Sequence, residues 1–358
     1  MKTQKKIAVL CNYRLMSERV GGMDHFYWLF DKECKQMGYE VIWFFPNESD
    51  HGEYNNLTII SAEDQSIEAL FLKYITNTKI VFDVVITHFL ELCTPFFKKI
   101  KTNFTCKVIA VDHNARPLNG YPLKKTVLKR IKGFLFSKHI DVFVAVSKYT
   151  TNLLVDDFGK QIKTKTVLVY NGINTGLFEK RTFRNFVHPT FLVASNLGYP
   201  KGIQDLIEAV SKLPENCMCK LKIDVYGTGN YEKQLEELVR KYNLEETFSF
   251  KGSRSNLFEI YNQYDYLLQP THMECFSLSV LESLSANVPV ITTSVGGNEE
   301  VIKNGENGFI FPPQDINRLS EILESVFIGK LRIIQDTSVL IEEQFSIQKM
   351  VKEHIALL

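Results

Sequence analysis

The sequence of 358 residues has no apolar run long enough to cross a membrane. No stretch reaches about 18 consecutive apolar residues, which is the length that a membrane-spanning helix needs. The N-terminal apolar run, Ile7 to Cys11, is too short for the hydrophobic region of a secretory signal and is followed by polar residues. We therefore expect a cytoplasmic protein, and any contact that it makes with the cell membrane would be peripheral, on the inner face.

The cysteines show neither a disulfide framework nor a zinc-binding pattern. There are seven of them, an odd number, and they are scattered along the chain. The pair Cys217 and Cys219 has no second pair at the spacing that zinc sites use. We expect free thiols, as is usual in a reducing compartment.

Composition and length indicate a folded protein of two domains. Hydrophobic residues make up 45% and charged residues 23%, values that exclude a disordered or fibrous chain. A chain of this length usually forms two domains rather than one. Residues 1–180 hold 25 Lys and Arg against 18 Asp and Glu, whereas the remainder holds 17 against 23, so the halves carry net charges of +7 and −6. The first half is thus suited to an anionic surface or substrate.

Short apolar runs rich in Val, Ile and Phe alternate with amphipathic stretches in both halves, which is typical of parallel strands joined by helices. In the first half we predict strands at 7–10, 41–45, 84–87, 108–111, 142–146 and 167–170. In the second half we predict them at 191–194, 221–226, 248–251, 266–268, 288–292 and 309–311. The fold class is therefore α/β, with two doubly wound sheets. Ligands of such sheets bind beyond the carboxyl ends of the strands.

Two further stretches define the organisation. Residues 23–37 form a helix whose buried stripe comprises Phe26, Phe30, Cys34 and Met37, and Gly38 ends it. Residues 171–189 are polar and aperiodic, which indicates the link between the domains.

The segment from Pro270 to Glu282 holds the most informative residues. Glu274 and Glu282 lie eight positions apart, between a predicted buried strand and a helix that begins near Ser277. The unpaired amides of a first helical turn suit a phosphate, and carboxylates accept hydrogen bonds from sugar hydroxyls. On spacing alone, a capped helix start with a solvated Glu282 explains the pattern equally well.

The segment resembles the signature of retaining family 4 glycosyltransferases of the GT-B type, in which two glutamates are separated by seven residues and Phe276 follows the first. Neighbouring motifs extend the resemblance along most of the chain. They are Gly21-Gly22, His113, Val146-Ser147-Lys148, Asn171-Gly172-Ile173, Lys201-Gly202, Gly227-Thr228-Gly229, Pro289-Val290, Gly296-Gly297 with Glu300, and Asn307-Gly308. The resemblance implies two Rossmann-like domains facing a central cleft. It places an acceptor-side domain at 1–178, a nucleotide-sugar domain at 179–340, and a C-terminal helix at 341–358 that packs back on the first domain.

The same resemblance implies a role for individual residues. Glu274 would hold hydroxyls of the transferred sugar, Lys201 would balance the charge of the leaving diphosphate, and His113 would lie near the reacting sugar. These three form the catalytic set. The donor-binding set comprises Gly22, Gly227, Ser253, Arg254, Cys275, Phe276, Ser277, Leu278, Ser279 and Glu282. Glu282 would accept hydrogen bonds from the two ribose hydroxyls, and the loop of Ser253 and Arg254 would receive the base.

The chain departs from the family pattern at two positions. Asn196 stands where the family usually has an Arg. Either another cation such as Arg254 replaces it, or turnover is slow, or the family's Arg position corresponds to a residue a few positions away. Ser277 stands where a Gly commonly follows Phe276, and a small residue there keeps the path of the loop. Gly227 and Gly229 lack the third glycine of a dinucleotide fingerprint, which excludes that interpretation.

The resemblance implies a retaining, metal-independent glycosyltransferase of the hexosyltransferase class, which moves a sugar from a nucleotide-sugar to a glycan or lipid-linked acceptor. A UDP-sugar is expected as donor, with a GDP-sugar as alternative. No cofactor, metal or nucleic acid is expected, and no Asp-x-Asp motif occurs. The pathway would be capsule, exopolysaccharide or lipopolysaccharide assembly. Two other interpretations stay open: a nucleotide-sugar epimerase or hydrolase on the same fold, and a non-catalytic partner subunit.

Residues 121–140 form a basic amphipathic helix. They include six Lys or Arg, no acid, and six apolar residues at helical spacing: Leu123, Val127, Leu128, Ile131, Phe134 and Leu135. Such a helix either docks on an anionic membrane or packs on its own sheet through the apolar stripe, with the lysines solvated outside. The sequence favours the second interpretation slightly.

Overall fold

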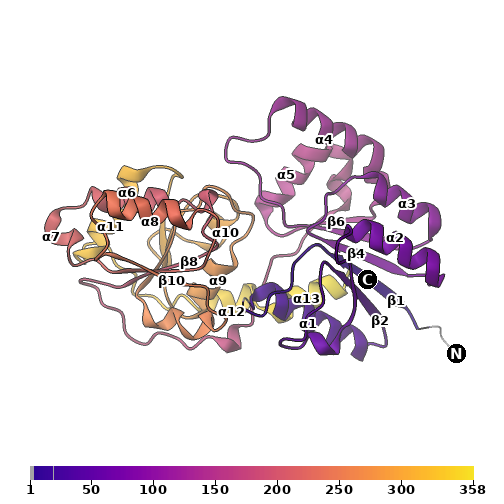
Figure 1. Ribbon diagram of the computed structural model, residues 1–358, viewed down its shortest axis with the longest axis horizontal. Helices are drawn as coiled ribbons and strands as arrows, with labels where there is room; N and C mark the ends of the chain where they lie inside the picture. Colours follow the sequence, from indigo (N-terminus) through magenta and orange to yellow (C-terminus); the bar gives the residue numbers. More distant parts are fainter. Residues whose placement is uncertain (1–3, 19) are drawn as a thin grey trace. The chain divides into compact units, whose positions relative to one another are not determined.

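A computed structural model describes residues 4–18 and 20–358, which form two compact units. The first unit takes in the chain up to residue 114, residues 119–171 and residues 347–358, and the second takes in residues 115–118 and 172–346. Each unit contains one parallel sheet covered by helices (Figure 1). The domain limits that the sequence suggested, at residues 178 and 340, stay predictions beside this division.

The sheet of the first unit has seven parallel strands in the order β3-β2-β1-β4-β5-β6-β7. Their bounds are β1 Lys6–Cys11, β2 Glu40–Phe45, β3 Thr58–Ser61, β4 Val84–His88, β5 Lys107–Asp112, β6 Val142–Ala145 and β7 Thr166–Leu168. The six predicted strands are confirmed. Strand β3 was missed because it is short, lies at the edge of the sheet and is only partly buried, so its hydrophobic signal is weak.

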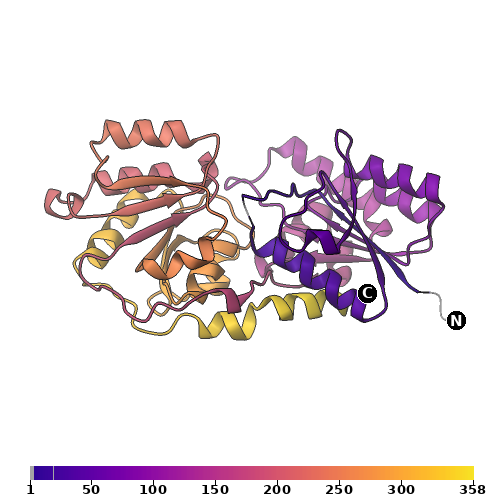
Figure 2. The ribbon, with the colours of Figure 1, turned by 60° about the horizontal axis from the view of Figure 1, so that its bottom comes forward.

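Six α-helices belong to the described part of the first unit. They are α1 Gly22–Gln36, α2 Ile67–Thr78, α3 Pro95–Asn103, α4 Leu123–Phe136, α5 Lys148–Phe158 and α13 Ile347–Ile355. Helices α2, α3 and α5 bury their apolar sides with the strands in one core cluster. Helix α13, formed by the last residues of the chain, packs against α1 (Figure 2).

Helix α1 confirms the predicted helix, with one error in its buried stripe. Phe26, Phe30 and Cys34 are buried as expected, and Gly38 follows the helix with a φ of 83°. Met37 is 58% exposed, because the helix ends at Gln36 and Met37 is already its C-cap. The periodicity was therefore extended one residue too far.

The sequence slightly favoured a helix at 121–140 that packs on its own sheet through its apolar stripe, and helix α4 contradicts this. Its partners are α5, α3 and the short 3-10 helix η2 (Ser137–His139), and Gly133 is the one residue within it that is fully buried. All six residues of the apolar stripe are exposed. The stripe therefore does not pack on the sheet, because α4 lies in an outer layer beside α5 (Figure 1).

The second unit contains six parallel strands in the order β10-β9-β8-β11-β12-β13. Their bounds are β8 Phe191–Ala194, β9 Ile223–Tyr226, β10 Phe248–Gly252, β11 Tyr266–Gln269, β12 Val290–Thr293 and β13 Gly308–Phe311, and all six predicted strands are confirmed. The strand order reverses between β8 and β11. In sheets of this kind ligands bind at such a reversal, beyond the carboxyl ends of the strands.

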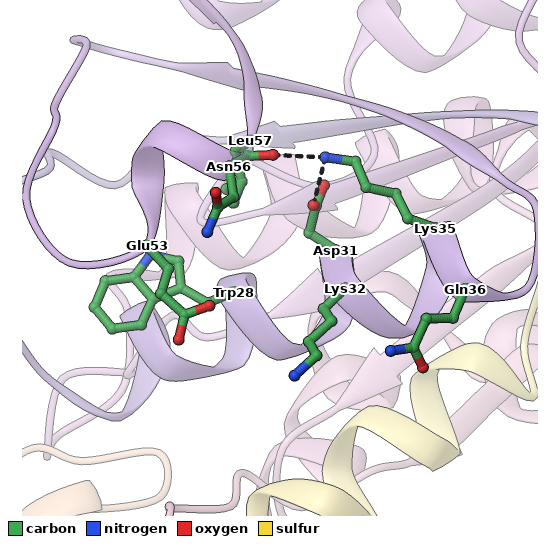
Figure 3. A pocket seen from close by; sticks show the side chains of 8 residues that line it. All are labelled: Trp28, Asp31, Lys32, Lys35, Gln36, Glu53, Asn56 and Leu57. Carbon is green, nitrogen blue, oxygen red and sulfur yellow. Dashed lines mark hydrogen bonds and ion pairs between the residues drawn. The ribbon is translucent and has the colours of Figure 1, made fainter.

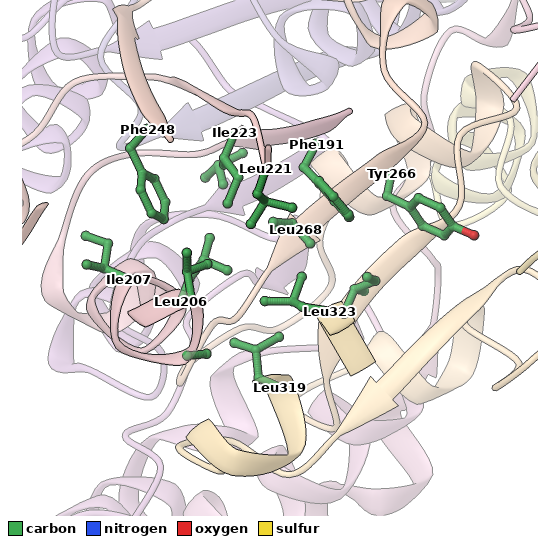
Figure 4. Close-up of a cluster of buried hydrophobic side chains, with 14 of the residues drawn as sticks. Phe191, Leu206, Ile207, Leu221, Ile223, Phe248, Tyr266, Leu268, Leu319 and Leu323 are labelled. Carbon is green, nitrogen blue, oxygen red and sulfur yellow. The ribbon is translucent and has the colours of Figure 1, made fainter. Parts of the chain in front are cut away.

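Helices cover both faces of this second sheet. They are α6 Ile203–Ser211, α7 Glu215–Met218, α8 Glu232–Lys241, α9 Leu278–Ser285, α10 Asn298–Val301, α11 Ile316–Phe327 and α12 Val339–Gln344. Helices α6, α8 and α11 bury their apolar sides with the strands, so that Leu206, Leu319 and Leu323 meet Phe191 and Leu268 (Figure 4). Helix α9 packs against β11, β12 and α12, and it begins at the edge where the chemistry was predicted.

All seven cysteines are free, as expected, and six of them are buried. Within the described residues, no helix is both long and apolar enough to span a membrane.

Candidate functional site

The loops that follow the central strands of the second unit are joined to one another by backbone contacts. His272 donates its backbone N–H to the carbonyl of Pro200 at 2.8 Å, which ties the loop after β11 to the loop after β8. Gly227 donates to the carbonyl of Gly252 at 2.9 Å, and Gly297 donates to Cys275 at 2.9 Å. The carboxyl edge of the sheet is therefore one continuous surface.

Glycines make these close approaches feasible. A Cβ on Gly202 would lie 1.8 Å from the carbonyl oxygen of Pro270, and one on Gly227 would lie 1.9 Å from that of Ser195. Both residues also have positive φ, 70° and 129°. A side chain at either position would force the loops apart, so the glycines act through packing of the loops.

Lys201 and Glu274, two of the predicted catalytic residues, form an ion pair. The Nζ of Lys201 lies 2.9 Å from Oε2 of Glu274, and the two side chains are 28% and 17% exposed. The second carboxylate oxygen of Glu274 accepts the backbone N–H of Cys275 at 3.1 Å. Both charged groups are thus held in fixed positions and remain accessible to a ligand.

The start of α9 confirms the predicted helix start near Ser277. Ser277 is the N-cap, and its Oγ accepts the backbone N–H of Val280 at 3.4 Å. The amides of Leu278 and Ser279 precede the first hydrogen bond within the helix, and the partial positive charge of this helix end favours an anion. Ser277 has a φ of −79°, so this position does not require the glycine that the family commonly has.

A buried polar network fixes the cap of α9. Gln269 donates from Nε2 to the Oγ of Ser277, while its Oε1 accepts hydrogen bonds from Thr292 at 2.9 Å and from Asn298 at 3.3 Å. Gln269, Thr292 and Asn298 are each at most 5% exposed. The sequence interpretation missed these residues, because single polar side chains at buried positions, two in strands and one at the start of α10, carry no periodic signal.

Glu282 lies on α9 and is partly buried. Its Oε2 accepts a hydrogen bond of 2.8 Å from the hydroxyl of Tyr261, which is fully buried. Burial raises the pKa of Glu282, and the hydrogen bond from Tyr261 opposes that rise. Burial and the adjacent carboxylate also raise the pKa of Tyr261, which keeps its hydroxyl protonated and donating. The carboxylate of Glu282 is therefore fixed by a hydrogen bond from a buried tyrosine and is not simply solvated. Tyr261 was not identified from the sequence.

His272 is another residue that the sequence interpretation did not identify. Its Nε2 lies 2.6 Å from Oδ2 of Asp205 in the first turn of α6, and its ring is 5% exposed. This contact connects α6 with the loop that carries Glu274, two residues farther along the chain.

The predicted base-binding residues lie on an exposed loop. Ser253 and Arg254 follow β10, and both are exposed. Next to them, Lys251 forms an ion pair of 3.5 Å with Asp224. Asn196, where the family has an Arg, is exposed in the loop after β8. Within the described chain, no side-chain hydrogen bond or ion pair joins these residues to Lys201 or Glu274.

His113, the third predicted catalytic residue, belongs to the first unit and follows β5 directly. Its Nε2 lies 3.0 Å from Nδ1 of His88, and its ring stacks on Phe89 with centroids 4.2 Å apart. Burial lowers the pKa of His113 to about 3, and the nearby His354 adds to this effect. The ring is therefore neutral at physiological pH, so it can form hydrogen bonds but supplies no positive charge.

Gly22 is the first residue of α1, also in the first unit. The preceding amide, that of Gly21, donates to Oδ2 of Asp24 at 2.9 Å. Asp24 is fully buried and also accepts from Tyr13 at 3.2 Å. A carboxylate thus occupies part of this helix start, and the predicted role of Gly22 stays a prediction.

An open pocket of about 570 Å³ lies elsewhere on the first unit, between α1 and the 3-10 helix η1 (Tyr54–Asn56) (Figure 3). Lys35 in its wall bonds to Asp31 and to the carbonyl of Asn56, each at 2.7 Å. None of the predicted site residues lines this pocket. Among the described residues, no group of three or more His, Cys, Asp or Glu could hold a metal ion.

Family models of known proteins match both halves of the chain. The model of "Glycosyltransferase Family 4" matches residues 20–177, and that of "Glycosyl transferases group 1" matches residues 179–334. The UDP-N-acetylglucosamine--peptide N-acetylglucosaminyltransferase GtfA subunit of Streptococcus pneumoniae is 26% identical over 205 residues. That alignment covers 55% of this chain and 39% of the relative, so the chain spans well under half of the relative's length.

Solved structures show the same fold at low identity. HepE of Anabaena, solved in complex with UDP and glucose, superimposes with a TM-score of 0.75 at 16% identity, covering 99% of this chain and 98% of HepE. WaaG, a glycosyltransferase involved in lipopolysaccharide biosynthesis, superimposes with a TM-score of 0.76 at 16% identity, covering 98% and 99%. With its two halves matched by consecutive family models, this chain belongs to glycosyltransferase family 4, the glycosyl transferases group 1.

Proposed function

We propose that this protein transfers a sugar from a nucleotide-sugar to a hydroxyl acceptor with retention of the anomeric configuration. The observation that carries the proposal is the Lys201–Glu274 ion pair at the carboxyl edge of the second sheet. It sets a cation and a carboxylate in the same loop region as the capped start of α9. A nucleotide-sugar needs all three groups, because it presents a diphosphate and sugar hydroxyls side by side.

In this proposal the second unit binds the donor. Lys201 and the first amides of α9 stabilise the negative charge that builds on the diphosphate as the glycosidic bond breaks. Glu274 accepts hydrogen bonds from hydroxyls of the transferred sugar, and Glu282 accepts them from the ribose. Ser253 and Arg254 contact the base, and Gly227 allows close approach of the backbone.

The reaction needs no enzyme nucleophile. The acceptor hydroxyl attacks the anomeric carbon on the face from which the diphosphate departs, and the departing phosphate takes the acceptor's proton. Glu274 then acts by positioning and by electrostatic support of the positively charged sugar centre. His113 accepts or donates one hydrogen bond to the sugar or the acceptor as a neutral imidazole.

Support for a UDP-sugar comes from the compared proteins. HepE was solved with UDP and glucose, and the streptococcal relative is named for UDP-N-acetylglucosamine. GDP-sugars are the alternative donors. The acceptor we propose is a glycan or lipid-linked glycan of capsule, exopolysaccharide or lipopolysaccharide assembly, which the net charge of +7 on the first half and the name of WaaG support. The protein would then work on the inner face of the cell membrane.

The first experiment is a thermal-shift screen against UDP-, GDP- and ADP-sugars. The true donor raises the unfolding midpoint, because a ligand that binds the folded state stabilises it by mass action. We expect a UDP-sugar to give the largest shift, and we expect EDTA to leave that shift unchanged. If no nucleotide or nucleotide-sugar shifts the midpoint, the proposal is wrong.

A second experiment separates transfer from the alternative activities. The stabilising donor is incubated with and without candidate glycan acceptors, and the products are followed by NMR. Retaining transfer gives an α-linked product from an α-linked donor only when the acceptor is present. Free sugar released without acceptor would indicate a hydrolase, and an epimerised nucleotide-sugar would indicate an epimerase. Donor binding with no turnover in any mixture would support a non-catalytic subunit.

A further inference from the structure

Helix α4 presents an apolar surface to solvent. The α4 apolar face consists of six residues that are between 48% and 80% exposed, with Leu123 at 78% and Phe134 at 80%. The six are Leu123, Val127, Leu128, Ile131, Phe134 and Leu135. At 3.6 residues per turn they span an arc of about 140° on one side of the helix. Apolar residues gathered on an exposed arc usually mark a binding surface.

The packing of α4 explains why this arc faces outward. Gly133 lies on the opposite side of the helix, and a Cβ there would come within 2.1 Å of the carbonyl oxygen of Phe158 in α5. The helix therefore lies flat on α5 through its one buried glycine, and its apolar residues cannot turn inward without losing this contact. The apolar face is therefore exposed because the opposite side of α4 packs closely against α5.

Exposed cations lie beside the α4 apolar face, and one of them, Lys124, lies within its arc. Lys124, Lys125 and Arg130 are exposed on α4. On the side toward the rest of the unit, Lys129 pairs with Asp157 at 2.7 Å and Lys132 pairs with Glu91 at 2.6 Å. The two neighbouring acids are thus already neutralised.

We propose that α4 docks on an anionic lipid surface, with its apolar face among the acyl chains and its cations at the lipid head groups. Charge complementarity selects this partner: residues 121–140 contain six cations and no acid, and long Lys and Arg side chains reach the head groups while the helix lies in the interface. Each cation near such a surface adds about 1 kcal/mol of attraction.

This inference goes beyond the proposed sugar transfer, because lipid binding is measured without donor or acceptor. The assay is sedimentation of the full chain with vesicles made of equal parts phosphatidylglycerol and phosphatidylcholine, and with vesicles of phosphatidylcholine alone. We expect binding to the anionic vesicles that weakens as salt is raised, and at least about tenfold weaker binding to the neutral ones.

Two pairs of substitutions test the surface itself. Leu123→Ser with Phe134→Ser is expected to lower vesicle binding by about tenfold or more, since each removes an apolar side chain from the interface. Lys124→Glu with Arg130→Glu is expected to lower it by a similar factor. All four positions are exposed, so the fold should be unaffected, which circular dichroism checks.

The matched controls lie in the second unit. Phe183→Ser with Ile334→Ser removes apolar side chains that are 70% and 69% exposed, and Lys233→Glu with Lys330→Glu reverses exposed charges. Neither should change vesicle binding.

The inference is overturned if the α4 variants bind like the parent chain, if neutral vesicles bind equally well, or if light scattering shows that the Leu123 and Phe134 substitutions dissociate a dimer. Thermal shift with the donor, measured on the same variants, should stay at the parent value, so failure of this inference is distinct from failure of the proposed transfer.

Discussion

At the scale of single residues, the site depends on the pairing of Lys201 with Glu274, which lie 73 positions apart in the sequence. The two side chains meet because Gly202 lets the loops after β8 and β11 approach closely, and because the backbone N–H of His272 donates to the carbonyl of Pro200. Since both are partly exposed, their mutual attraction is screened and adds little to stability. Their importance should therefore appear in the rate of reaction.

Glu274→Gln and Lys201→Met should each lower kcat for transfer by about 100-fold or more, because each removes charge that acts on the breaking glycosidic bond. The free energy of unfolding, measured in urea, should change by no more than about 1 kcal/mol. Arg318→Met is the control, since it breaks an exposed ion pair of 2.8 Å with Glu321 in the same unit and should leave kcat unchanged. Equal losses of activity and stability in the Glu274 variant would refute its role.

Tyr261→Phe should raise KM for the donor several-fold and leave kcat within about twofold, because Tyr261 acts on Glu282 and not on the reacting atoms. Its hydroxyl donates to Glu282 and opposes the rise in the pKa of that carboxyl. Without it the pKa of Glu282 rises further, so weakening of donor binding at acidic pH should begin at a higher pH in the variant. A purely structural role would move stability but leave the pH profile of KM where it is in the parent.

At the scale of elements, the loops after β8 and β11 are pressed together at Gly202. Its positive φ alone costs a non-glycine residue about 1 kcal/mol, and the added Cβ would also overlap the carbonyl of Pro270. Gly202→Ala should therefore destabilise the second unit by about 3 kcal/mol or more. It should also lower transfer, because Lys201 moves with the loop.

Gly305→Ala is the matched control for that prediction. Gly305 has a φ of 83° with nothing within 4 Å of an added Cβ, so only the backbone cost of about 1 kcal/mol should remain. Urea unfolding of both variants measures the difference. If both variants lose the same free energy of unfolding, the close approach of Gly202 to Pro270 does not contribute to the cost.

Helix α13 adds a pH-sensitive contact to the first unit. The ring of His354 is 2% exposed, packs on Phe26 with centroids 4.8 Å apart, and stacks on His88 at 6.0 Å. Burial lowers the pKa of His354 from 6.5 to about 4 and that of His88 well below its usual value. These rings are neutral in the folded unit, whereas they bind protons in the unfolded chain once the pH falls below 6.5.

The first unit should therefore be fully stable above about pH 6.5 and lose stability as the pH falls toward 4, with His354 alone accounting for at most about 3 kcal/mol. His354→Leu, which keeps an apolar side chain against Phe26, should reduce the loss between these pH values. Tryptophan fluorescence in urea measures it, because both tryptophans, Trp28 and Trp43, are buried in the first unit. An unchanged pH dependence in the variant would show that His354 is not responsible.

At the scale of the whole molecule, each unit has its own hydrophobic core, so the two should respond differently to ligands. UDP at 100 times its Kd should stabilise the unit that binds it by about 2.7 kcal/mol. We expect the unfolding transition seen by far-UV circular dichroism, which reports both units, to shift more than the tryptophan signal, which reports the first unit alone. A larger shift in the tryptophan signal would assign the main nucleotide contacts to the first unit.

The sequence by itself determined the α/β architecture, twelve of the thirteen described strands, and the family. Parallel strands buried on both faces appear in the sequence as continuous apolar runs. The motif from Glu274 to Glu282 is local in the sequence, so it can be recognised without the tertiary structure. Strand β3 escaped because an edge strand is only half buried.

Only the tertiary structure decided the contacts between residues far apart in the chain. The Lys201–Glu274 pair, the Tyr261–Glu282 hydrogen bond and the Gln269 network depend on which loops meet at the sheet edge. Tertiary contacts also determine that the apolar face of α4 is exposed to solvent. Its amphipathic pattern is identical whether the stripe faces a sheet or solvent, and it was the contact of Gly133 with α5 that turned the stripe outward. Sequence periodicity predicts that a helix has an apolar side and a polar side, whereas tertiary packing determines which side is buried.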